Sequence, residues 1–271
     1  MVIRSLGRRT DLMFAKFSGS VIDRGSYALV QTPSNPEFHW GNYIIFDRAP
    51  RKGSLKEWTT IFDKEFGYYP EPHHYVFTWD TGTDDKGEIK EFFEAGFEMD
   101  SAAVLTTSQL NEPPHINRGI DIRKISSEKD WCHVIDLHLL CSDPKYFNDA
   151  YEDFQRRKVS SYRSMIEAGL GAWFGAFLGG QLVGGLGVFH ENGIGRYQNV
   201  ETHPDHRRQG ICGTLVHQAG RRALDEFNID HLVMEADVHY HAARIYESVG
   251  FKRNEVNHAL SWWKGKNERS T

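Results

Sequence analysis

The sequence lacks the features that mark several classes of protein. No stretch approaches the roughly 18 consecutive apolar residues of a membrane-spanning helix. The arginines of the first ten residues are not followed by the apolar segment of a secretory signal. Lysine and arginine total 32 against 37 aspartate and glutamate residues, a net charge of −5, which disfavours binding to duplex nucleic acid through a general basic surface. We therefore expect neither a membrane nor a nucleic acid as partner.

Cysteine is also scarce. The three cysteines are Cys132, Cys141 and Cys212. They form no C-x-x-C pair and their number is odd, which does not suit a disulfide framework, so we expect reduced thiols and a cytoplasmic location. The 14 histidines show no third ligand at the spacing of a metal motif such as H-E-x-x-H. The sequence therefore predicts no metal site.

The chain has 271 residues, which suits one large domain or two small ones. Residues Ser108–Arg118, SQLNEPPHINR, hold a Pro-Pro pair and few apolar side chains, so we expect an extended, exposed linker. We divide the chain here into residues 1–112 and 113–271.

The C-terminal half predicts a regular succession of elements. Ser126 or Ser127 can cap the first helix, and Gly179-Gly180 and Asn192-Gly193 predict hairpin turns. Gly250 predicts the end of the last helix. The expected elements are, in order, a strand at 119–125, a helix to about 139, a helix at 149–168, strands at 172–178, 181–190 and 195–202, a helix at 210–227, a strand at 231–238, a helix at 241–249 and a closing strand pair in 251–264.

The sharpest local signal is HPDHRRQGICGTL at His203–Leu215, between an expected strand and an expected helix. Unpaired backbone N–H groups at a helix N-terminus, together with the helix dipole, form an anion site. Gly210 allows a phosphate to approach the backbone closely, and Arg207 and Arg208 add charge for a diphosphate. The alternative interpretation is an ordinary helix start with two solvated arginines.

A second signal is AARIYESVGF at Ala242–Phe251. Its simplest interpretation is an amphipathic helix that Gly250 ends. Its functional interpretation directs the hydroxyl of Tyr246 into a cleft near the phosphate loop. A tyrosine with a pKa of about 10 is protonated at neutral pH and can donate a proton to a leaving thiolate.

In this order the two motifs resemble the GNAT superfamily of acyl-CoA-dependent N-acyltransferases, over about residues 119–264. The first is similar to the family's V-x-P-x-x-R-x-x-G-x-G/A segment and the second to its A-x-x-x-Y-x-x-x-G-F segment. The resemblance implies an α+β fold with a mixed sheet flanked by helices, acetyl-CoA as co-substrate and Tyr246 as general acid. It also implies two groups of acetyl-CoA-binding residues, namely Val200, Glu201 and Thr202 for the pantetheine arm and Arg207, Arg208, Gln209, Gly210, Ile211, Cys212, Gly213 and Thr214 for the pyrophosphate.

The sequence departs from the family pattern at two places. Cys212 stands where the family has Gly or Ala, which still allows close approach and would expose a thiol to modification. His239 lies seven residues before Tyr246, where the family often has asparagine. We expect His239 to contact the CoA chain with a different geometry.

The acceptor amine must lose a proton, and the motifs do not specify the group that takes it. Glu201 is our first choice for this general base because its strand runs beside the expected acyl site. The alternation of strand side chains could also turn it away. The alternatives are Glu235 and Asp237 on the neighbouring strand, and His190 and Glu191 at the end of the preceding one.

The N-terminal half contains an echo of the C-terminal half at an offset of 154 residues. The segment IKEFFEAGF at 89–97 matches ARIYESVGF at 243–251, and Gly41 and Tyr43 match Gly195 and Tyr197. Between them we expect a strand at 42–46, a helix at 54–66 capped by Ser54 and a strand at 74–79.

We interpret residues 1–112 as a truncated, degenerate GNAT-like half in a tandem arrangement. Phe92 stands in place of Tyr246 and cannot donate a proton, and Arg51–Gly53 lack the R-x-x-G-x-G/A pattern. The alternative is an unrelated α+β cap.

The sequence thus predicts an enzyme that transfers an acetyl group from acetyl-CoA to a primary amine by direct attack in a ternary complex. The alternative is a non-catalytic acyl-CoA sensor or scaffold. The acceptor, a small molecule or a peptide, and assembly as a homodimer stay open.

Overall fold

The computed structural model describes residues 1–36, 38–67, 73–144, 149–238 and 242–264. The chain forms two compact units, Met1–Val104 with Glu255–Thr271, and Leu105–Asn254. This division differs from the expected one at residue 112, because the end of the chain returns to the first unit. Two strands, β5 (Glu98–Thr107) and β11 (Lys252–Trp263), therefore have residues in both units.

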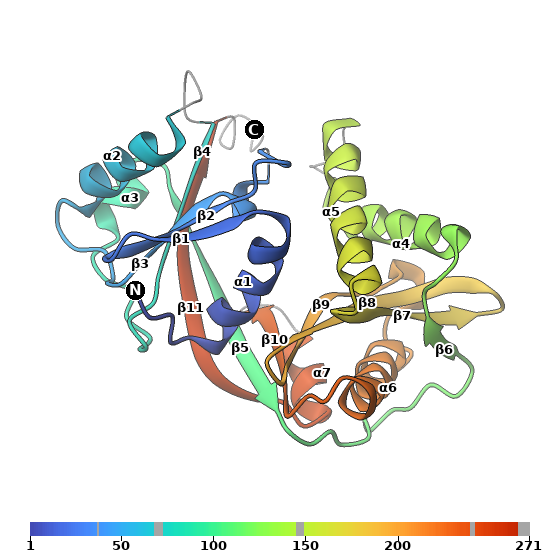
Figure 1. Ribbon diagram of the computed structural model, residues 1–271. Helices are drawn as coiled ribbons and strands as arrows, with labels where there is room; N and C mark the ends of the chain where they lie inside the picture. Colours follow the sequence, from blue (N-terminus) through green and yellow to red (C-terminus); the bar gives the residue numbers. More distant parts are fainter. Residues whose placement is uncertain (37, 68–72, 145–148, 239–241, 265–271) are drawn as a thin grey trace. The chain divides into compact units, whose positions relative to one another are not determined.

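The first unit is a sheet with helices on both faces (Figure 1). Its strands follow the order β1-β2-β3-β4-β11-β5, with β3 and β4 parallel and β4 and β11 antiparallel. Its other elements are α1 (Leu6–Ser18), β1 (Ser20–Asp23), β2 (Tyr27–Gln31), the 3₁₀ helix η1 (His39–Gly41), β3 (Tyr43–Phe46), α2 (Ser54–Phe66), β4 (His74–Trp79) and α3 (Lys90–Glu94).

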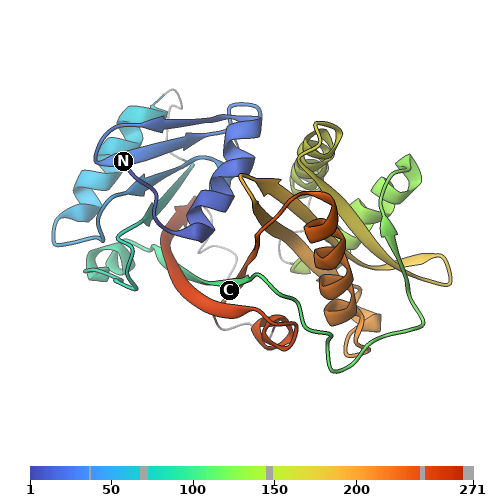
Figure 2. The same ribbon diagram turned by 60° about the horizontal axis from the view of Figure 1, so that its bottom comes forward.

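Alternation along the strands gives this sheet two apolar faces. Ile44 and Phe46 of β3 pack with Trp58 of α2 and Phe92 of α3. Ile45, between them, packs on the opposite face in a cluster that α1 supplies with Leu12 and Ala15. Helix α1 thus covers one face and α2 with α3 the other, as Figure 2 also shows.

The second unit has the strand order β10-β9-β8-β7-β6, antiparallel except for the parallel pair β9 and β10. Its elements are β6 (Asp121–Lys124), α4 (Glu128–Cys141), α5 (Asp149–Glu167), β7 (Gly171–Leu178), β8 (Gln181–Glu191), β9 (Ile194–Thr202), the 3₁₀ helix η3 (Pro204–His206), α6 (Ile211–Glu226), β10 (His231–Asp237) and α7 (Ala242–Ser248).

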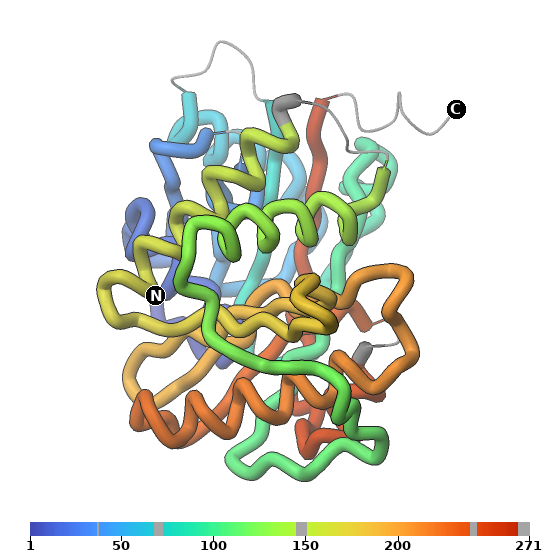
Figure 3. The backbone as a smooth tube through the Cα atoms, turned by 90° about the vertical axis from the view of Figure 1, so that its right-hand side faces the viewer, coloured from blue at the N-terminus to red at the C-terminus, as the bar shows by residue number. Residues whose placement is uncertain are grey.

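Two neighbouring glycines of β8 show how closely helices cover this sheet. A Cβ on Gly184 would meet Ile211 and Leu215 of α6, whereas a Cβ on Gly185 would meet Trp173 of β7 and Leu137 of α4. Helix α6 therefore lies on one face and α4 with α5 on the other (Figure 3).

Most local expectations are confirmed. The turns Gly179-Gly180 and Asn192-Gly193 have positive φ at both positions, and Gly250, with φ 104°, follows α7. Ser127 rather than Ser126 caps α4, by accepting a hydrogen bond from the N–H of Asp130.

Two expectations are wrong. The expected strand pair at 251–264 is the single strand β11, because its second half pairs with β4 from Ala259 to Trp263. Ser54 does not cap α2; Gly53 is the N-cap residue and supplies no side-chain bond. The hydroxyl of Ser54 instead accepts a hydrogen bond from the N–H of Arg51.

Candidate active site

A pocket of about 910 Å³ opens where β9 passes beyond its pairing with β10. The parallel register runs from Ile194 with His231 to Arg196 with Val233, so the last residues of β9 lie beyond it. Of the residues that the sequence predicts for the site, those that line the pocket are Val200, Glu201, Thr202, Arg207, Arg208, Gln209, Gly210, Ile211, Cys212, Gly213 and Tyr246.

The N-terminus of α6 forms one wall of the pocket. Its N-cap residue Gly210 has the left-handed conformation, with φ 77°, and no side chain caps the helix. The N–H groups of the first turn therefore lack the side-chain acceptor that most helices provide. Their partial charges and the helix dipole favour an anion at this wall.

Three arginines surround this helix start. The Nε of Arg207 donates to the carbonyl of Thr202 at 3.3 Å, which ties the loop to the end of β9. Within the described residues neither Arg208 nor Arg244 has an ion-pair partner, and both line the pocket. Uncompensated positive charge beside unsatisfied N–H groups makes this wall suited to a phosphate or diphosphate.

Sequence reasoning missed Arg244. It lies in the AARIYESVGF segment, two residues before Tyr246. Residues two apart do not share a face of a helix, so the spacing gave no signal that both would reach one pocket. Only the fold shows that this helix brings its arginine to the same pocket as Arg207 and Arg208.

The expected linker forms part of the pocket wall. The N–H of Asn117 donates to the hydroxyl of Thr214, and its side-chain amide donates to the carbonyl of Gln209. Pro113 is buried, and Pro113, Pro114 and His115 line the pocket. Figures 1 and 2 show this green segment after β5 passing the start of α6. The segment is extended, as expected, but it is not a free linker.

This packing gives Gly210 a second reason to be glycine. A Cβ on Gly210 would lie 2.5 Å from the carbonyl oxygen of His115, and the φ of 77° disfavours any side chain. Replacement of Gly210 would therefore strain the loop itself, not only the approach of a phosphate.

Thr214 is the one described residue of the predicted site that does not line the pocket. The residue is 1% exposed, and its hydroxyl donates to the carbonyl of Gly210 while it accepts from the N–H of Asn117. Its N–H also bonds to the carbonyl of Gly210. Both of its donors are thus used within the fold, and we remove Thr214 from the candidate site. His239 lies outside the described residues.

Two cysteines lie at the pocket, and burial sets their protonation. Burial raises the pKa of the Cys212 thiol to about 12 and that of Cys141 to about 11, the latter with help from the charge of Glu201. Both are thiols at neutral pH, and thiols react slowly with electrophiles. The expectation that Cys212 is open to modification is therefore not supported.

Tyr246 belongs to α7 and faces the pocket with 6% of its surface exposed. The turn after the helix is fixed, because the N–H groups of Val249 and Phe251 both donate to the carbonyl of Tyr246. Gly250 allows this turn through its positive φ. The ring thus sits at a rigid helix end beside the helix start of α6.

Glu201 also lines the pocket, and an irregularity of β9 explains why. The register with β8 shifts between Gly185–Glu201 and Gly187–Gln198, which is a β-bulge, and Asn199 has a positive φ of 47°. A bulge redirects the side chains that follow it. Glu201 then meets the imidazole of His138, whose Nδ1 contacts its Oε2.

The other candidates for the general base do not line the pocket. Glu235 forms an ion pair with Arg196 at 3.3 Å. His190 stacks on Phe227, with ring centroids 4.7 Å apart. Among the carboxylates that the sequence offered, the structure brings only Glu201 to the pocket.

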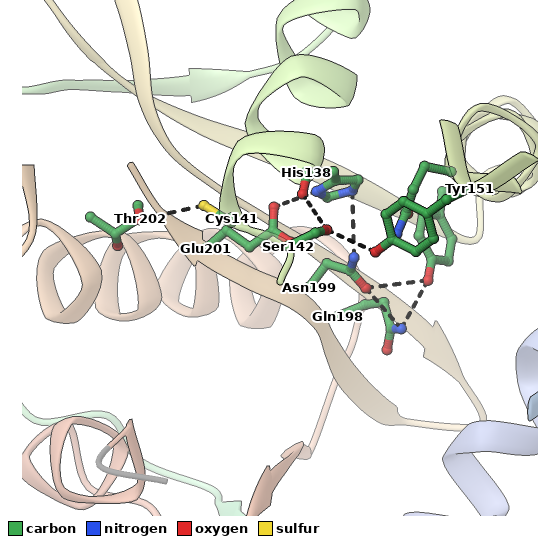
Figure 4. Close-up of polar contacts among 10 residues, drawn as sticks. His138, Cys141, Ser142, Tyr151, Gln198, Asn199, Glu201 and Thr202 are labelled. Atoms are coloured by element: carbon green, nitrogen blue, oxygen red, sulfur yellow. Dashed lines mark hydrogen bonds and ion pairs between the residues drawn. The ribbon is translucent and has the colours of Figure 1, made fainter. Parts of the chain in front are cut away.

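A polar network extends from Glu201 toward α5 (Figure 4). Asn199 contacts Nε2 of His138 at 3.5 Å and the hydroxyl of Tyr162 at 3.4 Å. Gln198 donates to the Tyr162 hydroxyl at 2.8 Å. The side chains come from α4, α5 and β9, so sequence spacing offered no signal for it.

The family model of the acetyltransferase (GNAT) domain matches residues 170–253. These residues form a GNAT domain. The match includes β9, α6 and α7, which carry most of the pocket. No curated protein matches the chain in sequence.

Solved structures extend the likeness to most of the chain. A functionally unknown conserved protein of Staphylococcus epidermidis has 17% identity and a TM-score of 0.71, over 92% of this chain and 95% of its own. A GCN5-related N-acetyltransferase of Kribbella flavida has 11% identity and a TM-score of 0.65, over 97% and 98%. A tandem GNAT protein of the clavulanic acid biosynthesis pathway has 11% identity and a TM-score of 0.55, over 82% and 75%. The fold is thus a tandem GNAT arrangement.

We also searched the described residues for metal-binding clusters and for membrane-spanning helices. They contain no group of three or more His, Cys, Asp and Glu side chains that could hold a metal ion. Among them, no helix combines the length and apolar character needed to cross a membrane.

Proposed function

We propose that the GNAT domain transfers an acetyl group from acetyl-CoA to a primary amine. The observation that carries this proposal is the pocket itself. It combines an uncapped helix N-terminus with Arg208 and Arg244, which form no ion pair within the described part of the chain, and with a tyrosine and a carboxylate. Membership in an acetyltransferase domain family supports the general acyl-transfer chemistry.

The residues present fit coenzyme A. Its pyrophosphate needs N–H donors and cations, which the first turn of α6 and the arginines Arg207, Arg208 and Arg244 supply. Its pantetheine arm offers amides that can bond to a strand edge, and Val200–Thr202 lie beyond the pairing of β9 with β10, which runs from Ile194 to Arg196. A pocket of about 910 Å³ suits a large ligand of this kind.

The chemistry follows from two proton transfers. The amine nitrogen forms a bond to the thioester carbonyl carbon and loses a proton to Glu201. The carbon–sulfur bond breaks, and the sulfur of coenzyme A takes the hydroxyl proton of Tyr246. Both residues line the same pocket. A positioned acid or base of this kind contributes about 10²–10⁴-fold to a rate.

The alternative is an acyl-CoA sensor or scaffold that binds without turnover. A titration with acetyl-CoA tests binding, and release of the CoA thiol with a panel of small amines and peptides tests transfer. We expect both to be positive, with thiol release that depends on the amine. Binding without amine-dependent release across the panel would favour the sensor.

We also propose a cytoplasmic location for the protein. The three cysteines are free, which fits a reducing compartment such as the cytoplasm. The acceptor is a small molecule or peptide that carries a primary amine, and the amine panel is the means to narrow it.

A further inference from the structure

We propose that His138 is a positioning residue for Glu201, and that this pairing holds Glu201 ready to take the proton of the acceptor amine. The inference rests on the proposed acyl transfer and deepens it. It names a residue of α4, 63 positions away in sequence, as part of the machinery.

Exposure assigns different roles to the two side chains. Glu201 keeps 19% of its side chain exposed and lines the pocket, whereas His138 exposes 2% and does not. An amine in the pocket can therefore reach Glu201 but not His138. Glu201 is the group that exchanges protons with the substrate, and His138 acts through it.

The surrounding network assigns the tautomer of His138. The Asn199 Oδ1 faces two donors, the Tyr162 hydroxyl at 3.4 Å and the Gln198 Nε2 at 3.2 Å. Its amide nitrogen therefore points to Nε2 of His138, at 3.5 Å, and donates to it. With Nε2 as acceptor, the imidazole proton lies on Nδ1, which donates to Oε2 of Glu201.

Packing holds the imidazole of His138, and a hydrogen bond holds its backbone. Its ring packs edge-on against Trp173, with centroids 5.4 Å apart and planes at 69°. The carbonyl of His138 accepts a hydrogen bond from the Ser142 hydroxyl, which in turn accepts from Tyr151. Figure 4 shows His138, Ser142 and Tyr151 on the helical side of the network and Glu201 on β9.

This arrangement serves a base in two ways. The N–H of His138 satisfies one oxygen of a largely buried carboxyl group and fixes the rotamer of the Glu201 side chain. The remaining lone pairs of the carboxylate stay available for the proton that leaves the amine nitrogen as the carbon–nitrogen bond forms. Without that N–H, the carboxyl oxygen would lose its hydrogen-bond donor and the side chain its fixed rotamer.

The test compares two replacements of the same residue. His138→Phe keeps a ring against Trp173 and removes the donor. His138→Asn places an amide N–H near the position of the imidazole Nδ1–H. His133→Asn, on the same helix, is the matched control, because His133 Nδ1 has no hydrogen-bond partner among the described residues and His133 does not line the pocket.

We expect single-turnover acetyl transfer to fall about 10²–10⁴-fold in Glu201→Gln. In His138→Phe it should fall roughly 10- to 100-fold, the size of one charge-assisted hydrogen bond. His138→Asn should recover most of the loss, and His133→Asn should equal the wild type. Acetyl-CoA affinity should be unchanged in all four variants, because none alters the anion-binding wall.

A second readout does not depend on turnover. In protein with labelled histidine, the Nδ1–H of His138 should give a downfield proton resonance that shifts in Glu201→Gln and is missing in both His138 variants. Absence of this resonance from the wild type would overturn the pairing. A normal single-turnover rate in His138→Phe, or a His138→Asn rate no better than that of His138→Phe, would overturn the positioning role.

The two proposals can fail separately. Acetyl-CoA binding with the resonance present but no transfer to any amine would refute the proposed function. The pairing would then be structural, and its catalytic role would fall too. Active wild-type enzyme with unaffected His138 variants would refute the positioning role alone.

Discussion

The helices α6 and α2 begin in the same way but meet different partners. Gly210 and Gly53 are both left-handed N-cap residues, with φ 77° and 85°, and neither helix has a side-chain cap. At α2 the carboxylate of Glu91 accepts from the N–H of Gly53, at 2.9 and 3.1 Å. At α6 the helix start faces a pocket. The same backbone motif thus binds the carboxylate of Glu91 in the first unit, whereas in the second unit it is open to the anion of a bound ligand.

The counterparts of the tyrosine differ in a similar way. Tyr246 lines the pocket, whereas Phe92 is fully buried among Trp58, Phe77 and Phe97. The chain before α3 also closes over the start of α2, because the N–H of Glu88 donates to the carbonyl of Pro50 at 2.7 Å. The first unit has kept the fold and has filled the space that the second unit leaves open.

The largest effect is expected from exchanging the two aromatic residues. Tyr246→Phe should keep acetyl-CoA affinity and lower single-turnover transfer about 10²–10⁴-fold, because only the hydroxyl proton is lost. Phe92→Tyr should not create activity and should lower the free energy of unfolding by about 1–3 kcal/mol, since it buries a hydroxyl without a partner. A normal single turnover of Tyr246→Phe across pH 6–9 would make Tyr246 a packing residue.

A smaller effect is expected from the pocket arginines Arg208 and Arg244. Arg208→Ala and Arg244→Ala should each raise the dissociation constant of acetyl-CoA by about tenfold or more, through loss of a charge-assisted hydrogen bond to a phosphate. The loss should shrink as salt rises, because salt screens the same attraction. Arg51→Ala, beside Gly53 in the first unit, is the control. Equal acetyl-CoA affinities for all three variants would show that the start of α6 is not the phosphate-binding site.

The two N-cap glycines form a matched pair for stability. A Cβ on Gly53 meets nothing within 4 Å. Gly53→Ala should therefore lower the free energy of unfolding by about 1–2 kcal/mol, only because alanine disfavours the left-handed conformation. Gly210→Ala should cost more, because its Cβ would lie 2.5 Å from the His115 carbonyl oxygen. Chemical denaturation measures both. Equal decreases in the free energy of unfolding would mean that the segment around His115 moves away from the new Cβ without a loss of stability.

The smallest effect is expected at Glu91. Glu91→Gln should lower the free energy of unfolding by about 0.5–1 kcal/mol, because the start of α2 loses a negative charge. The stoichiometry of acetyl-CoA should stay at one per chain, since Pro50 and the turn before α3 still close this helix start. If calorimetry shows that Glu91→Gln binds a second equivalent of acetyl-CoA, then Glu91 alone keeps the start of α2 closed to an external anion.

Much of the second unit was predictable because its signals are local. Gly179 and Gly180 take positive φ because glycine itself allows it. The arginine-rich loop could be placed from the signals of the strand β9 before it and the helix α6 after it. The N-terminal repeat was predictable in part for the same reason, since α2 and β4 have the bounds that the sequence predicts. The pairing of β3 with β4 is parallel, like that of β9 with β10.

The sequence by itself therefore determined most elements of the second unit, α2 and β4 of the first, the two motifs and the relation between the halves. It gave no prediction for α1, β1, β2 and β5. Only the tertiary structure decided that the bulge at Asn199 directs Glu201 into the pocket, that His138 meets it, and that Thr214 is used within the fold. It also decided that the end of β11 pairs with β4 and that Glu91 fills the start of α2. The physical reason is that turns, caps and periodicity depend on adjacent residues, whereas these contacts join residues far apart in the chain whose register is set by packing alone.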